Sequence, residues 1–340
     1  MRASEIKHDP VLQPLVYAFL RSETGIAIIA FVVAASVPLA ISGYPVYILP
    51  QYMLYGVLAM SLGLLWGFAG ILSFGQAAFF ALGAYAMGLS EKWGLGANPG
   101  YVGLAASLVI GAALAAAIGF FLFSAGVRNV YFVLVTLALS IMVEQITVSQ
   151  SQVTGGYNGM FIPRMSLGII AGHKLSLSKD AAIYYVILPV VGVVYGLLRW
   201  LLASPFGKVL IGVRENEDRV LSLGFRTSLY KTAAFAASGA IACLAGALYG
   251  IDANFVSPSL GGVLLSTQVV VWVAIGGRES LLGALGGAVA VSALSSYLSA
   301  IIPNYWQLAL GIVFIAVIIA FKGGVAGALR RAGGGGVGRS

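Results

Sequence analysis

Long apolar runs separated by short polar or glycine-rich stretches make up most of the chain. A helix needs about 20 apolar residues to cross a bilayer, and several of these runs reach that length. Ten runs can be delimited, at residues 26–42, 51–69, 76–90, 102–124, 130–148, 184–202, 232–250, 264–276, 281–301 and 305–321. The pattern predicts an all-α, polytopic integral membrane protein with about ten transmembrane helices.

Two of the runs are shorter than a straight span requires. The third run (76–90) and the eighth run (264–276) are flanked by glycines, which favours broken or re-entrant helices at these places. The first run begins too far along the chain to predict a cleavable signal peptide, so it is interpreted as a retained span.

Composition narrows the class of protein further. Of the residues, 60% are apolar and 9% are charged, and the mean hydropathy is +0.97. An ordinary soluble domain is about 25% charged, so a soluble enzyme, a disordered chain and a secreted disulfide scaffold are excluded. The single cysteine, Cys243, can form no disulfide within the chain. We expect one membrane domain over residues 1–340.

Basic residues are distributed unevenly between the predicted loops. If both termini are cytoplasmic, 15 of the 19 Lys and Arg residues lie on the cytoplasmic side, as the positive-inside rule requires. This orientation accounts for the net charge of +8, so nucleic acid is not expected as a partner. Residues 1–25 then form a cytoplasmic N-terminal segment, and residues 328–340 form a flexible, glycine-rich cytoplasmic tail.

The predicted cytoplasmic loop at residues 203–231 is the most charged stretch of the chain. Pro205 is a favourable first helical residue and Gly224 suits a helix C-terminus. Between them, apolar residues alternate with charges at helical spacing, which predicts one or two short amphipathic helices. The residues alone leave two interpretations open: a helix on the lipid surface, or a docking element for a soluble partner. Mixed charges at 214–219 are not the polybasic pattern of a lipid anchor.

Several short motifs occur in order between about residues 50 and 327. Residues 66–85 read WGFAGILSFGQAAFFALGAY, and residues 154–159 read TGGYNG. Further pieces are YF at 131–132, TLA at 136–138, YK at 230–231, AGALY at 245–249, IGG at 275–277, SLLG at 280–283 and FKGG at 321–324. Through this ordered set the chain resembles permease subunits of the branched-chain amino acid ABC importer family, and the M-type subunit more than the H-type.

The resemblance implies a set of partners in a bacterial inner membrane. The chain would form a heterodimer with a homologous H-type permease, surrounded by membrane lipid. Two ATPase subunits would bind the cytoplasmic loops of the two permeases, and an extracytoplasmic binding protein would deliver the solute. The implied cargo is a branched-chain amino acid, whereas related permeases carry urea or short amides. The chain itself would bind no cofactor, because ATP and Mg²⁺ belong to the ATPase subunits.

The resemblance also implies that the charged loop is the ATPase-docking element. ABC permeases carry an E-A-A-x3-G pattern in this loop; here Asp218 and Gly224 match its carboxylate and glycine, while both alanines are replaced. The candidate docking residues are Arg214, Glu215, Asn216, Glu217, Asp218, Arg219, Ser222, Leu223 and Gly224.

Motifs for catalysis are absent from the sequence. There is no G-x4-G-K-[ST] phosphate loop, G-x-S-x-G elbow, H-E-x-x-H pair or paired intramembrane carboxylates. His8 and His173 lie far apart in sequence and form no metal-ligand cluster. We therefore predict a non-catalytic subunit with no catalytic or metal-binding residues. A stand-alone channel or secondary transporter is the alternative, and the lack of intramembrane charge pairs disfavours it.

Three places are candidates for the solute path. The break between the second and third runs would expose backbone groups that lipid does not tolerate, although a tight turn would also explain it. A carboxylate near the outer end of the fifth run could line a vestibule or simply snorkel. The glycine-rich motif at 154–159 could contact the binding protein or form a plain turn. The candidate residues are Ser73, Phe74, Gln76, Glu144, Gln145, Tyr157 and Asn158.

Overall fold

The computed structural model describes residues 23–40, 43–96, 98–127, 130–163, 166–170, 173–176 and 180–320. Most of the predicted N-terminal segment at 1–25, up to residue 22, lies outside this part of the chain. The predicted tail at 328–340 lies outside it entirely.

Every predicted apolar run coincides with a helix. The helices are α2 (Glu23–Ala40), α3 (Tyr44–Gly63), α4 (Gln76–Lys92), α5 (Pro99–Ser124), α6 (Val130–Ser149), α8 (Asp180–Ala203), α9 (Pro205–Ser222), α10 (Thr227–Ala253), α11 (Val263–Gly276), α12 (Leu281–Ile301) and α13 (Trp306–Ala320). The π-helical turn η1 (Leu64–Ala69) extends α3. Among the described residues, six helices are long and apolar enough to cross a membrane. The all-α membrane fold is therefore confirmed, while the count of about ten spans stays a prediction.

Short elements that the sequence did not predict occupy the segments after α6 and α10. The first segment holds α7 (Ser151–Thr154), the 3-10 turn η2 (Gly156–Asn158) and the strand β1 (Met160–Phe161). It continues through β2 (Ser166–Ile170) and β3 (His173–Ser176), which form an antiparallel hairpin. After α10, β4 (Phe255–Val256) pairs antiparallel with β1, and the 3-10 turn η3 (Pro258–Gly261) leads into α11. Two-residue strands are too short to show an alternating pattern, so periodicity could not reveal them.

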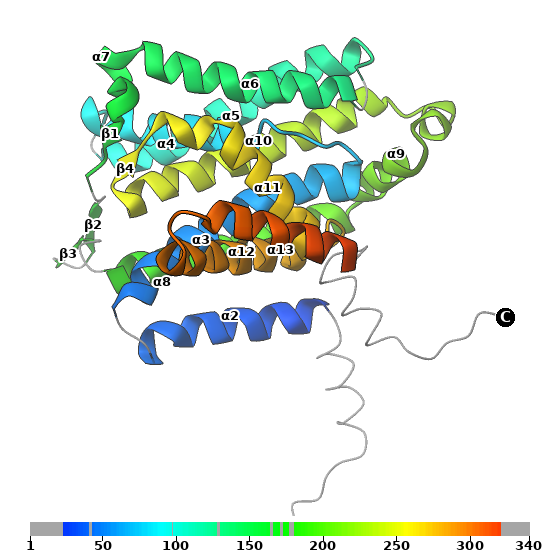
Figure 1. Ribbon diagram of the computed structural model, residues 1–340. Coiled ribbons are helices and arrows are strands. Elements are labelled where there is room, and N and C mark those ends of the chain that lie inside the picture. The colour runs from blue at the N-terminus through cyan, green and yellow to red at the C-terminus, as the bar shows by residue number, and fades with distance from the viewer. Residues whose placement is uncertain are drawn as a thin grey trace, which may run out of the picture.

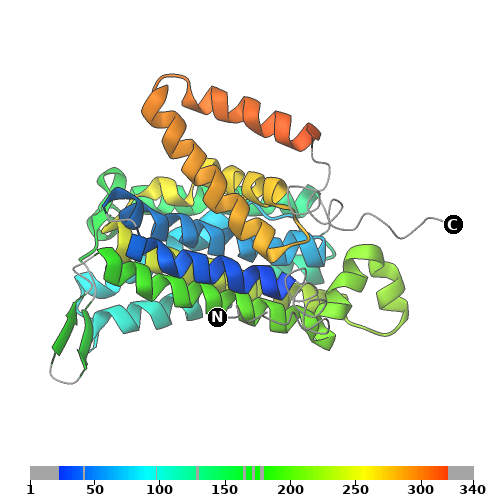
Figure 2. The same ribbon diagram turned by 90° about the horizontal axis from the view of Figure 1, so that it is seen from below.

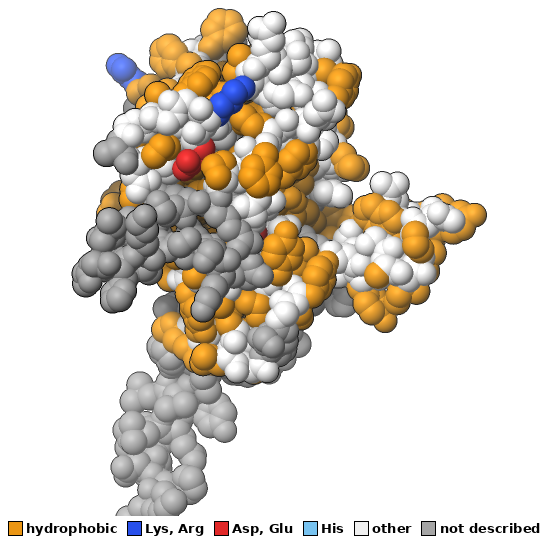
Figure 3. All heavy atoms as spheres, turned by 90° about the vertical axis from the view of Figure 1, so that its left-hand side faces the viewer, with side chains coloured by type: hydrophobic (Ala, Val, Ile, Leu, Met, Phe, Trp, Pro, Cys, Tyr) orange, Lys and Arg blue, Asp and Glu red, His pale blue; other side chains and the backbone are white. Residues whose placement is uncertain are grey.

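The helices run roughly parallel to one another, so the bundle has two distinct ends (Figure 1). Helix α9 projects from one end, and the β2–β3 hairpin marks the other; we name these the α9 end and the β1 end. Helices α12 and α13 form a hairpin that leans away from the rest of the bundle (Figure 2). Figure 3 shows the β1 end, where charged side chains are sparse among the residues that are coloured.

The centre of the bundle is the contact between α4 and α10, with α3 and α5 packed on them. Small residues allow the two backbones to approach closely. A Cβ added at Gly83 would lie 1.9 Å from the Cys243 carbonyl oxygen, and one at Gly246 would lie 1.8 Å from that of Phe80. The Cys243 thiol also donates a hydrogen bond to the Phe79 carbonyl at 2.9 Å. These contacts hold α4 in place along its length.

We expect Gly246→Val to destabilise the protein, because the added side chain must push α4 and α10 apart. Overpacking of this kind costs about 1–3 kcal/mol, which should lower the midpoint of thermal unfolding in detergent. Gly196→Val on α8 is the matched control, since a Cβ there meets nothing within 4 Å. Equal melting temperatures for the two variants would contradict the packing argument.

Candidate functional site

Helix α9 is two short helices joined by a kink. Asn216 has extended backbone angles, φ −158° and ψ 98°. Its side-chain Oδ1 accepts a hydrogen bond from the Arg219 backbone N–H at 3.0 Å, so Asn216 caps the second helix. The sequence predicted one or two short amphipathic helices here; two are present, and Pro205 begins the first of them.

One face of α9 is buried against the bundle, and the opposite face is exposed. Leu210, Val213 and Val220 are buried. Glu215, Asn216, Asp218, Arg219, Ser222, Leu223 and Gly224 are all exposed candidate residues. Leu223 is 71% exposed, and Leu221 and Phe225 beside it are exposed as well. These three residues form an exposed apolar tip of the α9 region (Leu221, Leu223 and Phe225), next to charged groups.

Two other candidate residues of α9 point toward the bundle. The Glu217 carboxylate lies 2.6 Å from the Lys231 ammonium, and the Thr227 hydroxyl donates to the same oxygen at 2.9 Å. The Lys231 side chain is 8% exposed. Its ammonium lies 5.1 Å from the centre of the Phe123 ring, close enough for a cation–π contact. Glu217 thus connects α9 to α10.

Arg214 connects α9 to a different part of the bundle. Its guanidinium donates to the Gly67 carbonyl in η1 and lies 3.3 Å from the Glu279 carboxylate, in the turn between α11 and α12. Lys231 is not among the residues predicted for the site, because the sequence predicts a loop up to residue 231. Helix α10 instead begins at Thr227, so Lys231 lies in its first turns.

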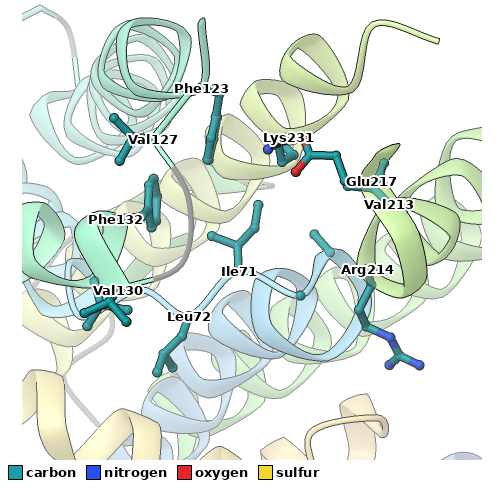
Figure 4. Close-up of a pocket in the computed structure, with 13 residues that line it drawn as sticks. Ile71, Leu72, Phe123, Val127, Val130, Phe132, Val213, Arg214, Glu217 and Lys231 are labelled. Carbon is teal, nitrogen blue, oxygen red and sulfur yellow. Dashed lines mark ion pairs between the residues drawn. The ribbon is translucent and has the colours of Figure 1, made fainter. Parts of the chain in front are cut away.

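A cavity of about 620 Å³ opens beside these ion pairs, as Figure 4 shows. Ile71, Leu72, Phe123 and Phe132 line it with apolar surface, and Glu217 and Lys231 border it on one side. The cavity separates α9 from the turn between α5 and α6. Helix α9 is therefore attached to the bundle by its buried apolar face and by these polar contacts, with open space next to the ion pairs.

The break between α3 and α4 is an extended segment inside the bundle (Figure 1). Gly70 ends η1 in the left-handed conformation, φ 73°, which glycine adopts without strain. The chain then runs back between helices, and α4 begins at Gln76. The Phe74 N–H donates to the Thr136 hydroxyl at 3.1 Å, and the Ser140 hydroxyl donates to the Phe74 carbonyl at 2.8 Å. Side chains of α6 thus satisfy both backbone groups of Phe74, in the middle of the break.

A buried polar network holds the first residue of α4. The Ser61 hydroxyl donates to Gln76 Oε1 at 3.1 Å, and Gln76 Nε2 donates to the Ser238 hydroxyl at 3.1 Å. The Ser238 hydroxyl in turn donates to the Ser61 carbonyl at 2.7 Å. Ser73 is also buried, and its hydroxyl accepts from the Gly75 N–H at 3.2 Å. The candidates Ser73, Phe74 and Gln76 are therefore brought together around the break.

The remaining path candidates lie elsewhere. The Glu144 carboxylate lies beside Gly262, which precedes α11, since a Cβ on that glycine would be 2.6 Å from Oε2. A helix N-terminus favours a negative charge there. Gln145 lines an apolar surface groove on α6 instead. Tyr157 is 82% exposed at the β1 end, and Asn158 beside it is exposed too.

The family model for the branched-chain amino acid transport system permease component matches residues 44–318. The chain belongs to this permease family. The ordered motifs of the sequence therefore identified the family correctly, and the permease is a multi-pass membrane protein. Among the described residues, no three potential ligands gather into a metal site.

Relatives of this chain include branched-chain amino acid permeases and a permease named for another solute. The permease is 29% identical over 310 residues to the high-affinity branched-chain amino acid transport permease LivM of Escherichia coli, covering 85% of this chain and 71% of the relative. It is 28% identical over 311 residues to LivM of Salmonella typhimurium, with the same coverage. The autoinducer 2 import permease LsrC of Salmonella typhi is 29% identical over 143 residues, which are 40% of this chain and 41% of the relative. No solved structure matches significantly.

We expect Ser238→Ala to destabilise the permease, because it leaves the buried Gln76 amide without its acceptor. An unsatisfied buried polar group costs about 1–3 kcal/mol. Thermal unfolding in detergent measures the change. The exposed Ser149→Ala is the control, since that hydroxyl bonds the backbone of its own helix. Unchanged stability of the Ser238 variant would show that the network does not hold the break.

Proposed function

We propose that this chain is the membrane-spanning subunit of an ATP-driven importer that takes up branched-chain amino acids. The family and the LivM relatives support the transport role. The observation that supports ATP-driven transport is the exposed tip of α9. It projects from the bundle, and its apolar and charged groups suit contact with another protein. ATP and Mg²⁺ would bind to separate ATPase subunits, so this chain is not itself the enzyme.

The docking proposal rests on the chemistry of the α9 tip. Leu223 and its apolar neighbours are exposed at the end of the bundle where water is expected, so they have no lipid to cover them. An apolar patch rimmed by charges is typical of a protein–protein contact. Asp218 and Arg219 form part of that rim. A groove on an ATPase subunit would bury the leucine and pair with the charges.

Charge distribution favours a cytoplasmic location for the α9 end. Lys208, Arg219, Arg226 and Arg278 are at the α9 end, whereas Lys92 and Lys174 are at the β1 end. Positive residues favour the cytoplasmic side of a membrane. Because α2 begins and α13 ends toward the α9 end (Figure 1), both termini would be cytoplasmic. We propose a bacterial inner membrane and about ten spans, counting the shorter helices.

The ion pair between Glu217 and Lys231 would couple movement of α9 to the helices of the bundle. Lys231 is held by Glu217, and Ser238 lies two turns further along α10 on the same face. Ser238 contacts Gln76 at the start of α4. A displacement of α9 by the ATPase would therefore be transmitted along α10, a single helix, to the break before α4. The cavity beside α9 leaves room for the movement.

At the β1 end, an exposed aromatic surface would receive the solute-binding protein. Tyr157 and Phe161 are 82% and 72% exposed, and Phe255 is exposed on the paired strand. Aromatic side chains of this kind are frequent anchors in protein contacts. A homologous H-type permease would enclose the solute path together with this chain. The LsrC match shows that permeases of related sequence are named for other cargo.

We expect Asp218→Lys combined with Leu223→Asp to abolish co-purification of the ATPase while membrane insertion persists. The pair removes both the rim charge and the apolar contact. Co-expression with the ATPase and affinity purification in mild detergent provide the measurement. Tyr305→Asp, in the turn between α12 and α13, is the control that should retain the ATPase. Normal recovery of the ATPase with the double variant would overturn the docking proposal.

We expect Lys231→Met to leave ATPase binding intact and to lower ATP-driven uptake roughly tenfold. The change removes the link to Glu217 without altering the exposed tip. The exchange Glu217→Lys with Lys231→Glu should recover part of the uptake, because it restores an ion pair. Lys208→Met removes an exposed lysine of α9 and serves as the control. An exchange variant as inactive as Lys231→Met would count against a linking role.

Cargo is tested by uptake into vesicles that contain the complete transporter. We expect radiolabelled leucine and valine to accumulate only with ATP, because the ATPase drives the cycle. Accumulation of urea or acetamide in place of the amino acids would reassign the cargo. Uptake by this subunit in vesicles without an ATPase would overturn the ATP-driven importer altogether.

A further inference from the structure

A small polar cavity lies within the apolar part of the bundle, apart from the α9 site. It has a volume of about 190 Å³ and is bounded by α3, α11, α12 and α13. It lies where the α12–α13 hairpin leans away from the other helices (Figure 2). Its position near the middle of these helices puts it at the depth of the hydrocarbon core.

Hydroxyl and amide groups line one part of this cavity. The residues are Tyr52, Gln268, Ser292, Ser295 and Ser296. The Tyr52 hydroxyl donates to the Ser296 hydroxyl at 2.5 Å. The Ser292 hydroxyl is buried and finds no hydrogen-bond partner among the described residues. A buried hydroxyl left unpaired is costly, so a bound molecule that pairs with it would remove this cost.

Apolar and aromatic side chains line the other part. Tyr55, Trp272 and Phe314 contribute rings, and the Tyr55 and Trp272 rings are 5.1 Å apart. Among the described residues that line the cavity, none carries a charge. A lipid chain would gain nothing from the serines and the glutamine. A solute with a hydrogen-bonding head and an apolar body matches both parts of the lining.

We propose that this cavity is a binding station for the transported solute on its way through the membrane, taking one aliphatic amino acid. The inference rests on the proposed importer function and assigns a site within it. Hydroxyls and the Gln268 amide would pair with the carboxylate and ammonium, and the rings would contact the side chain. The cavity is smaller than the ~300–1,000 Å³ of typical ligand pockets, which suits a single amino acid.

The absence of charge among the lining residues fits transient occupancy. A path requires binding strong enough to admit a solute and weak enough to release it. A carboxylate or guanidinium in the membrane interior would hold a zwitterion tightly, whereas neutral hydrogen bonds contribute modestly. None of the residues that the sequence analysis selected for the path lies in this cavity. Its serines share one face of α12 and look like ordinary small residues of a membrane helix, and only the packing of four helices brings Tyr52 and Gln268 to them.

Cysteine labelling in the complete transporter tests the proposal. The only native cysteine, Cys243, is buried, so the unaltered protein provides the labelling blank. We expect Ser292→Cys to react with a small water-soluble thiosulfonate in proteoliposomes, and leucine to slow that reaction several-fold. Ala293→Cys, one residue along and exposed on the outer surface of α12, is the control whose labelling leucine should not change. Labelling of the Ser292→Cys variant that leucine leaves unchanged would overturn the proposal.

A kinetic measurement addresses the same site without relying on cysteine. We expect Ser292→Ala to raise the KM for leucine uptake roughly two- to tenfold, the worth of one neutral hydrogen bond, with ATPase binding unchanged. An unaltered KM would overturn the assignment. If the unaltered complex takes up leucine but neither effect is seen, only the binding station fails. If that complex takes up no amino acid, the proposed function itself fails.

Discussion

Everything in this structure depends on pairing backbone polar groups that lipid cannot hydrate. Most are paired inside helices, but the extended segment before α4 has no helix of its own. Thr136 and Ser140 on α6 supply the partners of Phe74 within it, and hydrogen bonds among Gln76, Ser61 and Ser238 hold the helix that follows. An interrupted helix can therefore exist at this depth only because three other helices surround it.

The same arrangement brings distant parts of the permease into contact. Helix α10 carries Lys231 at the α9 end and Ser238 further inside, so one element meets both the docking helix and the break. Gly83 and Gly246 keep α4 and α10 in backbone contact beyond that point. A rigid pair of helices is thus anchored at one end to the part of the protein on which an ATPase would act.

Two kinds of surface have different chemistry in this permease. The α9 tip combines exposed leucines with charges and projects from the bundle, which suits a stable contact with a soluble subunit. The cavity beneath α12 and α13 is polar, uncharged and small, which suits brief contact with a solute. ATPase docking and solute passage are therefore proposed for separate places, connected through the helices that pack between them.

Apolar run lengths were sufficient to determine the helices and the membrane class, because burial in lipid imposes a length and a composition on each span. The ordered motifs likewise determined the family. Glu217, however, was predicted to be a docking residue, whereas its carboxylate pairs with Lys231, which lies in α10 rather than in a loop. The paired strands β1 and β4 and the serine-lined cavity join segments far apart in the chain. Contacts of that kind leave no periodic trace in the sequence, so only the tertiary structure decides them.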